Sequence, residues 1–145
     1  MAYLLDTSVV SDLVRRPQGV VAERIRVVGE SDVATSIIVA AELRYGAAKE
    51  GSERLSAQLE AVLRVLAVHA IQAPADRVNG DLRASLEREG RPIGANDLLL
   101  AAQALSGGLT RDRELAPVNH AVVEGRRERE RRVTARADAP AVAGA

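Results

Sequence analysis

The sequence predicts an α/β protein with three layers, in which helices cover both faces of a short, mainly parallel central sheet. Short stretches of strand type at residues 3–5, 32–35 and 68–71 are each followed by a segment with helical periodicity. This alternation is typical of parallel strands that are connected through helices. The length of 145 residues fits one domain with a core of ordinary size.

The composition excludes several classes of site. The chain is 47% hydrophobic, but it has no Phe, Trp or Cys and only two Tyr, so Leu, Val, Ile and Ala must fill the interior. The absence of cysteine removes disulfides, thiolate metal sites and a cysteine nucleophile. The lack of aromatics argues against nucleic-acid binding by base stacking. No apolar run approaches membrane-spanning length, and no basic leader precedes the first one, so we expect a cytoplasmic protein without membrane contact.

The net charge is zero but unevenly distributed. Residues 126–145 contain six Arg and three acidic residues, whereas residues 1–125 carry 14 basic and 17 acidic ones. We therefore expect an acidic domain over 1–124, followed by a flexible tail over 125–145 that is first Arg/Glu-rich and then Ala-rich. An acidic body does not hold nucleic acid by charge alone, so cations would have to mediate contact with a polyanion.

Asp6 follows the first strand candidate directly. In open α/β sheets, ligands bind at the carboxyl ends of the strands, which makes this aspartate a candidate functional residue. The alternative is a turn or capping aspartate, because Asp, Thr and Ser dominate such turns. Helices are expected from Val9 to Val14 and from Val20 to Val28.

Glu42 lies within a helix expected from Ile37 to about Lys49, with Ser36 as its cap. None of the residues three or four positions away from Glu42 is basic, and most are apolar. An acid on such a face is costly unless a hydrogen-bond network, a raised pKa or a bound cation compensates it. Glu42 is thus either functional or a satisfied core glutamate. By contrast, Glu60 has Arg64 at i+4, as expected of a solvated helix surface.

The middle of the chain offers no catalytic set. Residues 53–68 have the apolar spacing of an amphipathic helix, and Pro74 opens another that runs to about Glu89. His69 and His120 stand alone, so a nucleophile relay based on histidine has no visible partners.

Asp97 is predicted at the start of a mostly apolar helix. Pro92 and Gly94 interrupt the chain before it, and Asn96 is a residue type that caps helices. The positive end of the helix dipole favours a carboxylate in the first turn, so capping alone could explain Asp97. A functional role requires other carboxylates placed in the same way.

Asp112 is the last candidate acid. It follows a short strand remnant at Leu109-Thr110 and stands between Arg111 and Arg113, so a surface salt bridge is its simpler explanation. A final strand is expected over 121–124.

In the predicted α/β/α arrangement, the four acids Asp6, Glu42, Asp97 and Asp112 could converge on one edge of the sheet. Bare carboxylates this close would raise one another's pKa, and a divalent cation removes that conflict. With oxygen ligands only, such a site suits Mg²⁺ or Mn²⁺. Ions of this kind activate water and stabilise charge in displacements at phosphorus.

Three segments carry a resemblance to a family: Leu4-Leu5-Asp6-Thr7-Ser8, Ala41-Glu42-Leu43-Arg44-Tyr45-Gly46 and the stretch from Pro92 to Ala102. In order and spacing, across about residues 1–124, they resemble the motifs of PIN-domain ribonucleases, and closely those of the VapC toxins of type II toxin-antitoxin systems. The resemblance implies a PIN-like fold and an Mg²⁺-dependent endoribonuclease that cleaves tRNA or another structured RNA. It also implies a cognate antitoxin, a homodimer and toxin-antitoxin hetero-oligomers.

The same resemblance implies that Asp6, Glu42, Asp97 and Asp112 are catalytic, with Asp6 and Asp97 as metal ligands. The chain departs from the family before Asp112, where only Gly108 and Leu109 stand in place of a full apolar strand.

Two alternative functions follow from the sequence. One is a degraded PIN module that acts only by binding antitoxin or RNA, because the segment before Asp112 is shortened. The other is an aspartyl-phosphate phosphatase, since Leu5-Asp6-Thr7-Ser8 is similar to half of its Asp-x-Asp motif. Ser8 and the single lysine, Lys49, supply that chemistry poorly.

Overall fold

The computed structural model describes residues 3–107 and the backbone of 110–111. Four strands, six α-helices and one 3-10 helix make up this part of the chain. In chain order they are β1 Tyr3–Leu5, α1 Thr7–Arg15, α2 Val20–Val28, η1 Glu30–Asp32, β2 Val33–Ser36, α3 Ile37–Glu50, α4 Glu53–Val65, β3 Ala67–His69, α5 Ala75–Arg88, α6 Ala95–Ser106 and β4 Thr110–Arg111.

The strands form one parallel sheet in the order β3-β2-β1-β4. Tyr3 pairs with Val33 on one side and with Thr110 on the other, so β1 lies inside the sheet. Parallel neighbours need crossover connections, and here helices supply them. Because all four strands run the same way, the residues that follow β1, β2 and β3 emerge at a common edge.

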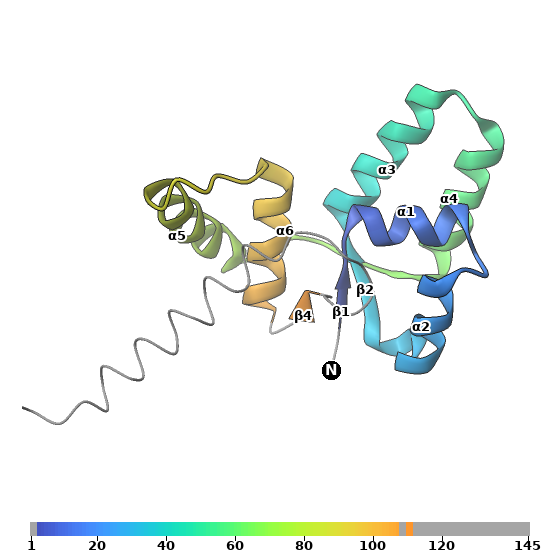
Figure 1. Ribbon diagram of the computed structural model, residues 1–145, viewed down its shortest axis with the longest axis horizontal. Helices are drawn as coiled ribbons and strands as arrows, with labels where there is room; N and C mark the ends of the chain where they lie inside the picture. The colour runs from blue at the N-terminus through green and yellow to red at the C-terminus, as the bar shows by residue number, and fades with distance from the viewer. Residues whose placement is uncertain (1–2, 108–109, 112–145) are drawn as a thin grey trace, which may run out of the picture.

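Helices cover both faces of the sheet, as the sequence predicts. In Figure 1, α1 to α4 gather on one side of the strands, and α5 and α6 lie on the other. The larger core contains the fully buried Leu4, Leu5 and Val10 and reaches Leu100 of α6. A smaller apolar cluster joins α5 to α6. The predicted three-layer α/β/α fold is therefore confirmed.

Short polar side chains start several of the helices. Ser36 Oγ accepts a hydrogen bond from the Ile38 N–H at 3.2 Å, and Ser52 Oγ accepts one from the Leu55 N–H at the same distance. Each bond satisfies an amide that has no partner inside its helix. Between these two helices Gly51 has φ +67°, the left-handed conformation that glycine adopts without strain.

The differences from the sequence predictions are local. The helix expected over 53–68 ends at Val65. Its last apolar residues belong to β3 at Ala67–His69, which starts one residue and ends two residues earlier than the strand expected at 68–71. Helix α6 starts after Gly94, so Asn96 is in its first turn and is not its cap. Asp112, the strand over 121–124 and the tail over 125–145 lie outside the described residues.

Within residues 3–107, no helix combines the length and apolar character that crossing a membrane would require.

Candidate active site

Asp6 stands at the junction between β1 and α1. Its Oδ1 accepts a hydrogen bond from the Val9 N–H at 3.0 Å, so it caps α1 while it sits at the carboxyl edge of the sheet. The strand end is itself anchored, because the buried Thr35 hydroxyl donates to the Leu5 carbonyl at 2.9 Å. The functional and the capping interpretation of Asp6 are therefore compatible: the cap fixes the side chain where ligands bind in this class of fold.

Glu42 connects two helices that are far apart in the sequence. Its Oε2 accepts a hydrogen bond from the Thr7 hydroxyl at 2.6 Å, and its Oε1 accepts one from the Asn96 amide at 2.7 Å. The side chain is half-buried on α3, near the buried Val39 and Ala40. A hydrogen-bond network therefore compensates the partial burial of the Glu42 carboxylate, and both donors in that network are neutral.

Asp97 lies in the first turn of α6, as predicted, and is exposed. Gly94, just before the helix, lies close to this side chain: a Cβ added at Gly94 would be 3.7 Å from Asp97 Oδ2, which is an ordinary contact distance. All of α6 is described, and Asp97 is its one charged residue. The positive end of the α6 dipole therefore attracts the Asp97 carboxylate, and no other charged residue of that helix weakens this attraction.

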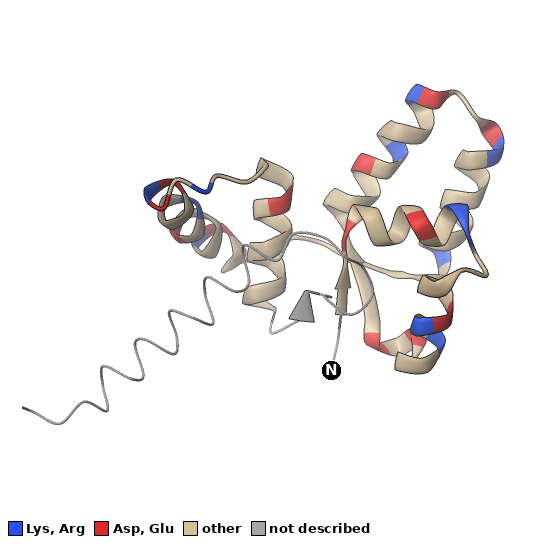
Figure 2. Cartoon of the chain, viewed as in Figure 1, with Lys and Arg blue, Asp and Glu red and all other residues tan. Residues whose placement is uncertain are grey.

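The structure brings three of the four predicted acids to one region. Thr7 directly follows Asp6 and Asn96 directly precedes Asp97, so the two donors to Glu42 place all three acids around the carboxyl end of β1. Figure 2 shows this grouping as red segments at the end of β1, within α3 and at the start of α6. Asp112 lies outside the described residues. Within those residues, no three acidic or histidine side chains come close enough to hold a metal ion together.

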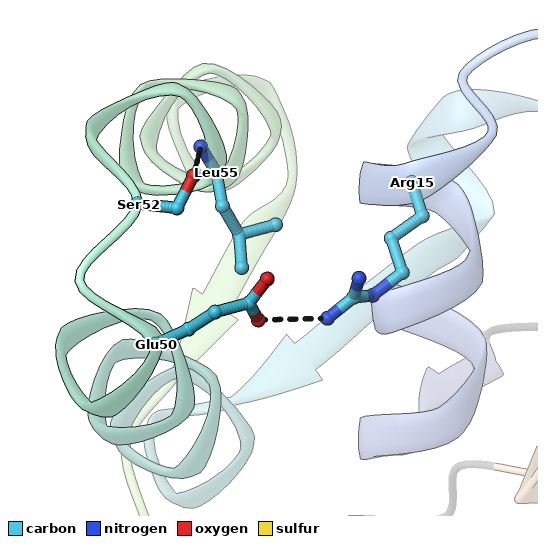
Figure 3. Close-up of polar contacts among 4 residues, drawn as sticks. All are labelled: Arg15, Glu50, Ser52 and Leu55. Carbon is cyan, nitrogen blue, oxygen red and sulfur yellow. Dashed lines mark hydrogen bonds and ion pairs between the residues drawn. The ribbon is translucent and has the colours of Figure 1, made fainter.

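A groove of about 240 Å³ opens beside Glu42, between α1, α3 and α4. Thr7 and Glu42 line it together with Leu43, Leu55 and other residues of these helices. Figure 3 shows Arg15, on α1, donating to Glu50, on α3, at 3.3 Å, with Leu55 nearby on α4. The ion pair joins two walls of a groove whose sides are otherwise largely apolar.

Sequence reasoning missed Thr7 and Asn96. Each was interpreted as a turn or capping residue, and each instead donates a hydrogen bond to Glu42, 35 and 54 residues away. The available signal was their position, since both are polar neighbours of predicted acids. The predicted pairing of Glu60 with Arg64 is wrong: Glu60 pairs with Arg44 at 2.8 Å.

Comparison with known proteins gives a consistent result. The PIN domain family model matches residues 3–121. A ribonuclease VapC2 of Haemophilus influenzae is 37% identical over 111 residues, which cover 75% of this chain and 83% of that protein. A tRNA(fMet)-specific endonuclease VapC of Shigella flexneri is 32% identical over 110 residues, covering 75% of this chain and 83% of the relative.

A solved structure shares the fold. The VapBC2 complex of Rickettsia felis, bound to a DNA fragment from its promoter, contains a chain that is similar with a TM-score of 0.71 and 30% sequence identity. The match covers 77% of this chain and 86% of that one. The acid-bearing edge of the sheet, the family match and these relatives agree, and the chain therefore belongs to the PIN-domain family, within its VapC ribonuclease group.

Proposed function

We propose that this protein is a metal-dependent endoribonuclease toxin. The observation that carries the proposal is the convergence of Asp6, Glu42 and Asp97 at the carboxyl edge of β1, linked through Thr7 and Asn96. Hydrolysis at phosphorus needs negative ligands for a cation and a site open to a polymer, and this edge is polar and partly exposed. Asp112, which follows the motif of the family, completes the proposed acid set.

Mg²⁺ is the proposed cofactor, and Mn²⁺ is a possible substitute. The donors fit a hard cation, because Asp6 and Asp97 offer only carboxylate oxygens and the chain has no cysteine. We assign these two residues as the metal ligands. When bound, the cation supplies Lewis-acid activation of water and stabilisation of charge at phosphorus. The protein residues bind it and keep their carboxylates at the sheet edge.

The proposed substrate is tRNA or another structured RNA. A relative from Shigella flexneri is named as a tRNA(fMet)-specific endonuclease, which supports this substrate class. The acidic character of residues 1–125 supports the cation requirement, because a bare acidic surface repels the phosphate backbone.

A cognate antitoxin is the proposed regulator, acting in a hetero-oligomer that also contains a homodimer of this chain. The similar structures include VapBC complexes from Rickettsia felis and from nontypeable Haemophilus influenzae. We expect addition of the antitoxin at equal molar concentration to suppress cleavage. Unchanged cleavage on adding a folded antitoxin that binds the protein would contradict this part of the proposal.

The central experiment measures cleavage of structured RNA by the purified protein with Mg²⁺, with EDTA, and by the Asp97→Asn variant. Loss of a metal ligand should lower the rate by about 100-fold or more, beyond the effect of most outer-shell changes. The Asp97→Asn change preserves the shape of the side chain, and circular dichroism controls for folding. Mg²⁺ added after EDTA should restore the wild-type rate.

Two outcomes would reject the metal-nuclease proposal. One is cleavage that persists in EDTA, and the other is an Asp97→Asn variant as active as the wild type. A folded wild type that binds RNA or antitoxin but never cleaves would instead identify a binding module. Phosphatase activity on a small ester that required Asp6 would identify the aspartyl-phosphate alternative.

A further inference from the structure

A second groove, of about 440 Å³, lies between α5 and α6. The two helices pack together through the smaller apolar cluster, which includes Leu86 and Leu98 (Figure 1). Ala95, in the first turn of α6, lines the groove, and Asn96 and Asp97 follow it directly. One turn of α6 therefore borders both the groove and the candidate active site, so an RNA chain held at Asp97 has the groove beside it.

The walls of this groove are apolar. Helix α6 contributes Leu98 and Leu99, α5 contributes Leu86, and the connection between them contributes Ile93. Leu86 and Leu98 are only 2% and 5% exposed, so the packed core holds them in place. Ile93 and Leu99 are half-buried and leave apolar surface in the groove. Such walls suit a ligand with apolar faces.

Three polar side chains of α5 line the same groove. Asn79, Arg83 and Glu87 follow one another at intervals of four residues and therefore share one face of the helix. Arg83 Nε donates to Glu87 Oε1 at 2.9 Å, and the guanidinium has further N–H donors on its two Nη atoms. Asn79 is half-buried, and within residues 3–107 no hydrogen bond uses its side-chain amide. The groove thus combines apolar walls with an amide and a guanidinium.

The charge of the groove favours the base of a nucleotide over its phosphate. Arg83 and Glu87 pair with each other, and every other residue that lines the groove is neutral. A nucleobase is uncharged, and unstacked RNA bases bind through their faces and their hydrogen-bonding edges, on arginine planes as well as on aromatic rings. Asparagine and arginine each form paired hydrogen bonds with a purine edge. A purine therefore matches this groove without any aromatic residue.

We propose that the groove between α5 and α6 binds a purine base of the RNA, next to the phosphate that is cleaved. Asn79 and Arg83 recognise the edge of the base, and the apolar walls contact its faces. These two residues then determine which sequences are cut. The inference rests on the proposed function, because it takes the reacting phosphate to lie at Asp6 and Asp97.

Neutral nucleosides test the groove without the metal or the reaction. Adenosine, guanosine, cytidine and uridine are titrated into the isotope-labelled full chain, and the amide signals of α5 and α6 are followed by NMR. We expect the purine nucleosides to bind about 10-fold more tightly than the pyrimidine ones, as one good base contact provides. Equal affinities for all four, or signal changes confined to other helices, would overturn the proposal.

Three variants identify the residues that recognise the base. Asn79→Leu keeps a similar size and removes the amide, and Arg83→Gln removes the guanidinium. Each should weaken purine binding by about 10-fold. Arg77→Gln removes a positive charge from an exposed position of α5 outside the groove and should leave binding unchanged. Thermal melting confirms that each variant folds. Equal losses in Arg77→Gln and Arg83→Gln would indicate a general charge effect and overturn the assignment.

The cut ends of a random-sequence RNA pool connect the groove to cleavage. With Mg²⁺, the wild type should prefer a purine at one position beside the cut. Asn79→Leu should reduce this preference by about 10-fold and still cleave. An unchanged preference would overturn the role of the groove in sequence selection.

The remaining outcomes separate this inference from its alternatives. A second copy of the chain could fill the groove instead. In that case no nucleoside would bind, sedimentation would show that Asn79→Leu weakens the dimer, and the base site would be rejected. Cleavage in Mg²⁺ by a protein that binds no nucleoside would reject the base site alone. A wild type that binds purine nucleosides but never cleaves RNA would reject the proposed function, so the two failures are distinguishable.

Discussion

Helix α3 presents two different electrostatic environments on two of its faces. Toward the sheet edge, Glu42 accepts hydrogen bonds from the neutral Thr7 and Asn96. Toward α4, two residues further along, Arg44 donates two hydrogen bonds to Glu60, at 2.8 and 3.0 Å. Neutral donors hold a carboxylate in place and leave its charge uncompensated, whereas arginine holds and neutralises it. The first arrangement suits a cation site and the second a solvent-exposed helix surface.

The largest effect on activity is expected when Glu42 is given an arginine partner, as Glu60 has. Asn96→Arg places a guanidinium beside Glu42 and adds positive charge next to Asp97. Cleavage of structured RNA should fall by about 100-fold, at the upper end of outer-shell effects, with weaker Mg²⁺ dependence. Rates measured across a Mg²⁺ titration check this. Gln18→Arg, at an exposed turn between α1 and α2, is the matched control. Wild-type rates for Asn96→Arg would show that uncompensated charge at this edge is not required.

A second substitution tests the buried side of the site. Thr35→Val keeps the size of a fully buried side chain but removes the hydroxyl that donates to the Leu5 carbonyl. We expect a loss of about 1 to 2 kcal/mol in the free energy of unfolding, because a buried acceptor loses a partner. Urea denaturation measures it. An unchanged midpoint would mean that the end of β1 is held by its strand neighbours alone.

The sequence predicted those parts of the site that depend on local pattern. Asp6 and Asp97 were located correctly because a strand end, a glycine and an apolar helix are visible within a few residues. The α/β/α layers were predictable for the same reason. The partners were not, because the bonds from Thr7 and Asn96 to Glu42 span 35 and 54 residues.

The two wrong predictions, the partner of Glu60 and the end of α4, also arise because local sequence does not show packing between distant segments. Glu60 has Arg64 one helical turn away, but it pairs with Arg44 on the neighbouring helix, 16 residues away. Local spacing shows which pairs are possible, and packing of α3 on α4 decides between them. The end of α4 was also misplaced, because its apolar pattern continues without a break from Val65 into β3.

A smaller effect is expected from α3 itself, which carries both regions. Gly46 lies within this helix, and a Cβ added there meets no atom within 4 Å. Gly46→Ala should therefore raise the free energy of unfolding by about 0.5 to 1 kcal/mol, since alanine loses less backbone entropy in a helix. Gly90→Ala is the opposite control: its φ of +66° disfavours a side chain, and it should destabilise the protein. A loss of stability in Gly46→Ala would contradict the open space seen at this position.

The smallest effect should come from the Arg44–Glu60 pair. The hydrogen bond from Arg44 lowers the pKa of the Glu60 carboxyl below its ordinary value, and the same bond raises the pKa of Arg44. Because the folded-state pKa of Glu60 is lowered, the pair contributes stability above the ordinary pKa of glutamate. That contribution is lost as the pH falls through the lowered pKa. Both side chains are substantially exposed, so solvent screens the interaction.

Glu60→Gln tests this by removing the charge and keeping the shape. At neutral pH and low salt, the variant should melt slightly below the wild type, by less than the shift that Gly46→Ala produces. The difference should disappear below the lowered pKa of Glu60, where the wild-type carboxyl is protonated, and also in high salt, which screens exposed charges. Melting curves over a pH series at two salt concentrations measure both effects. A difference that persisted at low pH would mean that Glu60 stabilises the packing of α3 against α4 by its shape and not by its charge. The face of α3 that carries the ion pair would then be held by uncharged contacts, as the face that carries Glu42 is.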